Sequence, residues 1–275
     1  MVVAGAPAST RSIVGDRVAA LTRTSAWTRV AAVPIAFRTF HPQGMVKVGE
    51  TLFVSSVEVI DRDAGKGIGH LFKIDMSGVL LADVRLGEGA IYHPGGIDTD
   101  GASLWIPVAE YRPDSRAIVY RVDLGTMKAS EVFRVADHVG AIVYNPDRKT
   151  LHGVSWGSRR FYRWSLGGLE QAKTSNPSHY VDYQDCKYAG HDRMLCGGVT
   201  EIRQTPDAPP FRLGGLDLIS LVDGRPLHQL PVLLWTDRGL DMTHNPVWIE
   251  PHGSGLRAYF MPEDDRSTLY IYDVT

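Results

Sequence analysis

The sequence predicts an all-β fold, a five-bladed β-propeller, and three observations support this class. A polar segment followed by a short apolar strand recurs five times, beginning at Phe40, Tyr92, Asp137, Gln184 and His244. These starts lie about 50 residues apart, a period typical of propellers built from short strands. Between Gly, Pro, Asp and Asn turns, β-branched and aromatic residues alternate with polar ones, and helical periodicity is weak.

Each of the first four repeats contains segments that predict four antiparallel strands, although the fourth strand of repeat three, before Tyr180, is poorly defined. The others are, in chain order, Gly44–Val48, Leu52–Val59, His70–Met76 and Val79–Leu86; Gly96–Asp98, Leu104–Glu110, Ala117–Asp123 and Ser130–Val135; Ala141–Tyr144, Leu151–Trp156 and Arg160–Leu166; Cys186–Tyr188, Met194–Glu201, Gly215–Leu221 and Val232–Trp235. The fifth repeat has only Val247–Glu250, Ala258–Met261 and Thr268–Val274.

The missing strand of the fifth repeat is predicted at the other end of the chain. We expect Thr28–Phe37 to pair with Thr268–Val274, because a three-stranded last blade would leave an open edge. Residues 1–27 then form an N-terminal extension, with a short helix over Ser12–Leu21 as one interpretation. Residues 1–275 are read as a single domain. A six-bladed propeller and a β-sandwich are the alternatives, and the sandwich does not explain the repeated segments.

Composition narrows the classes of partner. The formal net charge is −2 and no Lys/Arg run is present, which argues against nucleic acid. No stretch of about 18 apolar residues occurs, so no membrane span is expected. The first residues lack the features of a secretion signal. The chain as numbered is therefore expected in the cytoplasm, with secretion as the alternative if a signal has been removed. The sequence leaves the oligomeric state open.

The two cysteines are predicted to be neighbours in the fourth repeat. Cys186 and Cys196 lie on consecutive strands around a turn near residues 190–192. Directly opposed residues on antiparallel strands have Cα atoms about 4.5–5.5 Å apart. We expect this proximity, and free thiols for a cytosolic protein.

The repeat gathers titratable residues at one end of the propeller. The loop before each first strand and the loop after each second strand open on the same face of a propeller. The first loops carry His41, His93, Asp137 with His138, Asp185 and His244, and the ends of the second strands carry Glu58, Glu110, Glu201 and Glu263 with Asp264. Buried imidazoles and carboxylates are costly unless paired, so their concentration near an axis predicts a ligand site.

Two kinds of chemistry fit this set. His41, His93 and His244 could bind a divalent metal, the candidate cofactor, since imidazole suits zinc and iron. Alternatively they perform acid–base chemistry without metal, with Asp185 or Asp137 orienting them. The interpretation makes His41, His93, His244 and Asp185 catalytic. It assigns substrate contacts to Glu58, Glu110, Asp137, His138, Tyr92, Trp156 and Trp248.

The predicted function is therefore that of an enzyme acting on a small molecule at the channel mouth. Two alternatives remain open. One is a non-catalytic propeller that binds a small ligand, a sugar or a protein partner. The other is a structural relative whose mouth is plugged by side chains and whose histidines only bond a neighbouring blade.

Short motifs resemble the plant-type glutamine cyclotransferases, which are five-bladed propellers. Phe40-His41-Pro42-Gln43-Gly44 is similar to that family's F-T-Q-G-L, and Thr51-Leu52-Phe53-Val54-Ser55-Ser56 to its T-L-Y-x-S-T. Gln184-Asp185-Cys186-Lys187-Tyr188 resembles N-E-L-E-Y, and Asn245-Pro246-Val247-Trp248 echoes N-G-I-A. The chain looks closer still to bacterial and fungal propellers of unknown function with H-P-Q-G and H-P-G-G elements. The resemblance implies the fold and a site at the same mouth.

The chain departs from the cyclotransferase pattern where that family's chemistry is placed. The acidic residue of the family's F-G-E-G corresponds to Gly95, and the aromatic before it to His93. In the fourth repeat Lys187 stands where a second glutamate is expected. The resemblance therefore supports the fold and the position of the site more than glutamine cyclisation.

Overall fold

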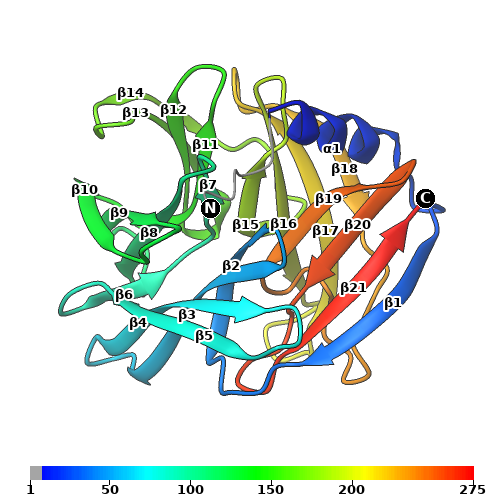
Figure 1. Ribbon diagram of the computed structural model, residues 1–275, viewed down its shortest axis with the longest axis horizontal. Helices are drawn as coiled ribbons and strands as arrows, with labels where there is room; N and C mark the ends of the chain where they lie inside the picture. The colour runs from blue at the N-terminus through cyan, green and yellow to red at the C-terminus, as the bar shows by residue number, and fades with distance from the viewer. Residues whose placement is uncertain (1–7) are drawn as a thin grey trace.

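The computed structural model describes residues 8–275, and its strands form five small sheets around a common centre, as a five-bladed propeller (Figure 1). The predicted fold class is confirmed. Blade one has the order β2-β3-β4-β5 and blade four the order β15-β16-β17-β18. Their strands are β2 (His41–Val48), β3 (Thr51–Asp61), β4 (Lys66–Asp75) and β5 (Leu80–Leu86), then β15 (Asp182–Tyr188), β16 (Arg193–Ile202), β17 (Phe211–Ser220) and β18 (Pro226–Pro231).

Blades two and three follow the same meander. In blade two the inner strand is split, so that both β6 and β7 pair with β8. The elements are β6 (Ile91–Pro94), β7 (Asp98–Thr99), β8 (Ser103–Glu110), β9 (Ala117–Asp123) and β10 (Ala129–Val135), then β11 (Val139–Asn145), β12 (Thr150–Ser155), the 3-10 turn η1 (Trp156–Ser158), β13 (Arg160–Ser165) and β14 (Glu170–Ser175). The strand β14 is the fourth strand that the sequence left poorly defined.

The N-terminal strand closes the last blade as predicted. Blade five has the order β1-β21-β20-β19, from β1 (Trp27–Pro34), β19 (Val247–His252), β20 (Gly255–Phe260) and β21 (Thr268–Val274). Trp27 lies opposite Val274, and Pro34 lies opposite Thr268. The open edge that β21 would otherwise present is thereby covered.

The N-terminal extension does contain a helix, α1 (Ala8–Ala20), which begins earlier than the predicted range. Val14, Val18 and Leu21 are buried in one cluster with residues of blades four and five. Arg11 extends from α1 to the buried Asp98 of β7, with Nη1 2.9 Å from Oδ1. This ion pair fixes the first turn of the helix. No helix within residues 8–275 is long and apolar enough to cross a membrane.

One strand prediction is wrong. The outer strand of blade four is β18 (Pro226–Pro231), not Val232–Trp235. Gly224 adopts a φ of 73°, which lets the chain turn immediately after β17 and pair with it at once. The apolar run that predicted the strand therefore comes after the pairing has ended.

The register prediction for the cysteines is confirmed, but the thiol prediction is wrong. Cys186 of β15 lies directly opposite Cys196 of β16. Their Cα atoms are 4.1 Å apart and their sulfurs form a disulfide bond. Side chains of directly opposed residues are the closest pairs in an antiparallel sheet, so this register brings the two sulfurs together.

Glycines in the repeated motifs allow the innermost strands to meet. A Cβ added at Gly44 would lie 2.6 Å from the Ile97 nitrogen, and one at Gly95 would lie 2.1 Å from the Gly140 oxygen. Gly96 donates its N–H to Gly140 O at 2.8 Å, so blades two and three are hydrogen-bonded at the centre. In each H-P-x-G element, the histidine thus precedes a point of close backbone contact.

Candidate functional site

Four histidines that precede or begin inner strands surround one cavity. His41 begins β2, His93 lies in β6, and His138 and His244 stand before β11 and β19. The cavity has a volume of about 320 Å³. Its lining also includes Gln43, Tyr111, Ser155, Trp156, Asp182, Tyr183 and Gln184. This volume lies at the lower end of the range of small-molecule sites, so the mouth is not plugged by side chains.

His41 forms a dyad with a carboxylate at the rim. Its Nδ1 lies 2.7 Å from Asp264 Oδ1, and its Nε2 lies 2.7 Å from the Gln43 side-chain nitrogen. Because the Gln43 amide donates, the imidazole accepts at Nε2 and donates from Nδ1 to the carboxylate. Asn245 donates a second hydrogen bond to Asp264, at 3.0 Å. Burial raises the pKa of Asp264, but the bonds from His41 and Asn245 outweigh this and lower it overall.

His93 is buried and has no hydrogen-bond partner among the described residues. Neither Nδ1 nor Nε2 is bonded. Its ring stacks on Tyr111 with centroids 4.1 Å apart and lies 5.7 Å from the His138 ring. Burial, together with the neighbouring His138, holds the pKa of His93 well below its usual value. A neutral imidazole here leaves one donor and one acceptor unsatisfied, at a cost of about 1–3 kcal/mol each.

His138 and His244 add two more neutral rings. His138 Nδ1 donates to the carbonyl oxygen of Glu110 at 2.9 Å, which leaves Nε2 as an acceptor. Burial lowers the pKa of His138 to about 4 and also lowers that of His244. His244 Nδ1 is buried without a bond to any residue in the described range. His93, His138 and His244 are therefore uncharged at neutral pH.

An arginine and a tyrosine cover His93 from the solvent side. The Arg62 guanidinium lies 4.1 Å from the centre of the Tyr111 ring, which in turn stacks on His93. The same guanidinium is 5.9 Å from the Trp156 ring. Arg62 comes from the β3–β4 turn and Tyr111 from the loop after β8, the loop class that was expected to open on this face. Sequence reasoning missed both, although Tyr111 directly follows the chosen Glu110.

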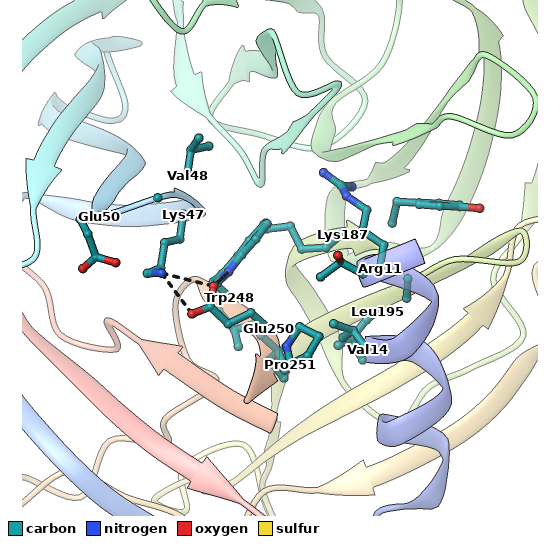
Figure 2. A pocket seen from close by; sticks show the side chains of 16 residues that line it. Arg11, Val14, Lys47, Val48, Glu50, Lys187, Leu195, Trp248, Glu250 and Pro251 are labelled. Atoms are coloured by element: carbon teal, nitrogen blue, oxygen red, sulfur yellow. Dashed lines mark hydrogen bonds and ion pairs between the residues drawn. The ribbon is translucent and has the colours of Figure 1, made fainter. Parts of the chain in front are cut away.

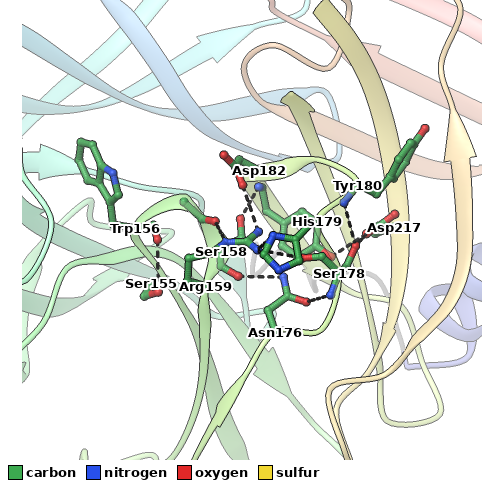
Figure 3. Close-up of polar contacts among 12 residues, drawn as sticks. Ser155, Trp156, Ser158, Arg159, Asn176, Ser178, His179, Tyr180, Asp182 and Asp217 are labelled. Carbon is green, nitrogen blue, oxygen red and sulfur yellow. Dashed lines mark hydrogen bonds and ion pairs between the residues drawn. The ribbon is translucent and has the colours of Figure 1, made fainter. Parts of the chain in front are cut away.

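A polar network holds the rim of the cavity between blades three and four (Figure 3). Arg159 Nη2 donates to Asp182 at 3.1 Å, and its Nη1 donates to His179 Nδ1 at 2.7 Å. Nearby, Asp217 accepts from Ser178 at 3.1 Å and from Tyr183 at 2.7 Å. These bonds fix the segment before β15, which carries Asp182 into the cavity wall.

Six predicted site residues do not line this cavity: Asp185, Glu58, Glu110, Asp137, Tyr92 and Trp248. Glu110 is instead paired with Arg112 at 2.6 Å and with Arg116 at 2.7 Å. Asp137 accepts from the Tyr162 hydroxyl and lies 3.3 Å from Arg160. The partners of Glu110 come from the loop between β8 and β9, and those of Asp137 come from β13.

The other four lie in four different places, of which the place of Asp185 is described below. Glu58 lines an adjoining groove of about 500 Å³ that shares His41 and Tyr111 with the cavity. Tyr92 is buried, with its ring where a side chain on Gly67 would be. Trp248 is at the opposite end of the propeller, in a second cavity. These residues lie outside the histidine cavity.

Asp185 lies at the centre of the fold and accepts hydrogen bonds from backbone N–H groups. Its side chain is fully buried and accepts hydrogen bonds from the N–H groups of Met45, at 2.9 Å, and Ile97, at 3.2 Å. It also forms an ion pair with Lys187. Burial raises the pKa of Asp185 to about 6 despite these bonds. The residue thus ties three blades together below the histidine cavity.

The predicted three-histidine metal site is not assembled. Among residues 8–275, no group of three or more His, Cys, Asp or Glu side chains is arranged to hold a metal ion. The rings of His41, His93 and His138 are instead engaged with aromatic neighbours, with Gln43, with Asp264 or with a backbone carbonyl. The donor set therefore fits hydrogen bonding better than coordination.

Comparisons to known proteins place the chain in a family and agree with its fold. Residues 2–275 match a family described as a family of unknown function, DUF6454. The chain belongs to this family. No curated protein matches the chain.

Solved structures similar to this DUF6454 chain share only its fold. A hypothetical protein from Leishmania major is 9% identical, with a TM-score of 0.53 and coverage of 88% of this chain and 90% of that one. The tail fibre of Staphylococcus aureus phage P68 is 9% identical, with a TM-score of 0.51 and coverage of 92% and 53%. A luciferin-regenerating enzyme is 10% identical, with a TM-score of 0.49 and coverage of 91% and 95%. The chain spans about half the length of the tail-fibre chain.

Proposed function

We propose that this DUF6454 protein is an enzyme that binds a small uncharged molecule in the histidine cavity and removes a proton from it, or from a water molecule, with His41. The observation that carries the proposal is the dyad of His41 and Asp264. His41 donates from Nδ1 to the carboxylate, which places the basic lone pair on Nε2 at the cavity wall; in the structure Gln43 donates to that lone pair, and the substrate or water takes the place of the Gln43 amide when His41 acts as the base. A general base oriented by a carboxylate is a recurring catalytic arrangement.

The charge distribution supports proton transfer in a defined direction. When Nε2 takes a proton, the positive charge on the imidazole lies against Asp264, whose lowered pKa keeps it ionised. His93, His138 and His244 stay neutral, because burial lowers the pKa of each. These rings can then form hydrogen bonds with the substrate, as donors or acceptors, without taking up the proton that His41 removes.

The shape of the cavity favours a compact ligand with a flat face. Trp156 and Tyr111 provide aromatic surface, and Gln43 provides an amide. His93 offers two unbonded ring nitrogens, which a ligand with paired hydrogen-bonding groups would satisfy. The resemblance of the inner-strand motifs to glutamine cyclotransferases supports a site at this mouth, while Gly95 replaces the acidic residue of that family. Glutamine cyclisation is therefore not proposed.

A ligand screen followed by kinetics tests the proposal. Uncharged metabolites that raise the melting temperature of the wild-type protein are assayed for turnover by NMR. We expect His41→Gln to lower kcat by about 10²- to 10⁴-fold, the usual contribution of a general base, and to leave KM within a few-fold. His252→Gln serves as the matched control, because His252 is exposed on blade five, away from the cavity.

Two results would contradict the proposal. If ligands bind in the cavity and none is converted, the non-catalytic propeller is the better description. If His41→Gln turns substrate over at the wild-type rate while binding is retained, the base must be another group. Asp264→Asn separates the two members of the dyad: it removes the carboxylate that orients His41 through Nδ1, so it should reduce kcat while ligand binding is retained.

A further inference from the structure

A second cavity lies at the opposite end of the propeller from the histidine cavity. Two inner strands run from one cavity to the other: β2 from His41 to Lys47, and β15 from Asp182 to Tyr188. The second cavity has a volume of about 340 Å³. A strand advances about 3.3 Å per residue, so several residues of β2 and of β15 separate the two cavities. They are distinct sites.

The wall of the second cavity is largely apolar and is completed by the N-terminal helix (Figure 2). Val14 of α1 and Leu195 of β16 lie close together in this wall, and Trp248 and Pro251 of β19 contribute further apolar surface. Arg11 of the same helix is held by Asp98 and by the carbonyl of Thr99, at 2.9 Å in each case. The docked helix α1 therefore forms one side of the cavity.

Three cations line this cavity, and each of them has a carboxylate partner. Arg11 is bonded to Asp98. Lys47 lies 3.1 Å and 3.3 Å from the two oxygens of Glu250, as the dashed lines in Figure 2 mark. Lys187 contacts Asp185, an acceptor whose oxygens are already shared with two backbone N–H groups. Its only other acceptor in the described chain is the Cys186 carbonyl, at 3.4 Å.

Lys187 is the cation least able to remain charged. Its residue is 8% exposed, and burial lowers its pKa, with Arg11 acting in the same direction and Asp185 opposing. An amine that loses its proton more readily than an ordinary lysine is a nucleophile near neutral pH, and burial in an apolar site is one of the known causes. Asp185, whose pKa is raised to about 6, is positioned to move a proton to or from this amine.

We propose that Lys187 forms a Schiff base with a small apolar aldehyde or ketone that binds in this second cavity. The Nζ lone pair attacks the carbonyl carbon, and a proton passes from nitrogen to oxygen to give a carbinolamine. The C–O bond then breaks as the hydroxyl leaves with a proton from Asp185, and the C=N double bond forms. Loss of the second N–H proton to Asp185 restores the acid, and the net products are the imine and one water molecule. Trp248, Val14 and Leu195 select the apolar part of the ligand.

Reductive trapping on the wild-type protein tests this proposal without any variant. The protein is incubated at neutral pH with benzaldehyde and cyanoborohydride, which reduces an imine to a stable secondary amine. Peptide mapping by mass spectrometry then gives the rate of benzylation at each lysine. We expect Lys187 to be benzylated several-fold faster than the exposed Lys149 and Lys173, because burial lowers its pKa and leaves more of it as the free amine. Lys47 lines the same cavity and also has a carboxylate partner, so it is the internal control, and it should be benzylated more slowly than Lys187.

Two lysine variants show whether the labelling occurs at Lys187. Lys187→Arg keeps a cation beside Asp185 but cannot form an imine, so labelling of the peptide around residue 187 should disappear while the fold is retained. Lys47→Arg should leave labelling of Lys187 unchanged. Labelling of Lys149 in native wild-type protein with none at Lys187 would overturn the proposal. So would labelling of Lys187 that occurs only after the protein is unfolded.

Discussion

Replacing His93 by Phe tests whether His93 binds a ligand or holds the fold together. The two roles predict opposite changes in the free energy of unfolding. The aromatic ring of Phe keeps the stacking on Tyr111, which is worth about 0.5–1.5 kcal/mol. The change breaks no hydrogen bond to a described residue, because neither ring nitrogen of His93 has a partner there. It removes a buried polar group whose unsatisfied atoms cost about 1–3 kcal/mol. We therefore expect the free energy of unfolding to be unchanged or higher.

The variant His138→Phe provides a reference for the size of the expected change in melting temperature. His138 donates to the Glu110 carbonyl, and removing it orphans that buried oxygen at about 1–3 kcal/mol. For a domain of this size, 1 kcal/mol corresponds to a shift in melting temperature of about 2–4 °C. We expect His93→Phe to melt at or a few degrees above wild type, and His138→Phe to melt below it.

Differential scanning calorimetry and a ligand titration on the same samples provide the assay. His93→Phe should lose affinity for any ligand of the histidine cavity by at least about tenfold, since one lost buried hydrogen bond is worth about 1.4 kcal/mol on that scale. A melting temperature well below wild type, together with unchanged affinity, would refute the reasoning. His93 would then hold a neighbouring blade, which is the structural alternative.

Two further predictions concern acid and the N-terminal strand. The pKa of His138 is about 4 in the folded protein and about 6.5 in the unfolded protein, so the unfolded state binds more protons between these pH values and the free energy of unfolding should fall as the pH drops from about 6.5 to about 4. The loss attributable to His138 is about 3 kcal/mol. Urea denaturation at several pH values measures it, and a midpoint that does not change with pH would contradict the prediction. Deleting residues 1–37 removes α1 and β1 and exposes the edge of β21. We expect the deletion protein to be insoluble, or soluble without the near-ultraviolet circular dichroism signal of fixed side-chain packing. A soluble deletion protein that unfolds cooperatively would show that β1 is dispensable.

Much of the fold followed from the sequence because the information is local. Each repeat carries its own turn residues and strand alternation, and the count of strands alone required Thr268–Val274 to find a partner near the N-terminus. The H-P-x-G elements also placed His41 and His93 at one mouth. Their glycines, Gly44 and Gly96, sit where the inner strands leave no room for a Cβ. The outer strand of blade four was missed because an apolar run does not reveal where pairing begins.

The sequence by itself determined the repeat, the closing strand and the face on which the histidines gather, since these depend on chain order and on the two-residue period of a strand. Only the tertiary structure decided what each polar group does. Trp248 is four positions beyond His244, and at about 3.3 Å per residue this carries it to the other end of the propeller. Asp185 and Asp264 are both carboxylates near the axis, yet the first is fully enclosed by backbone N–H groups and Lys187 while the second meets His41 at the solvent edge. The difference arises from how far along the axis each side chain lies, which sets its burial and its partners, and no local pattern encodes that distance.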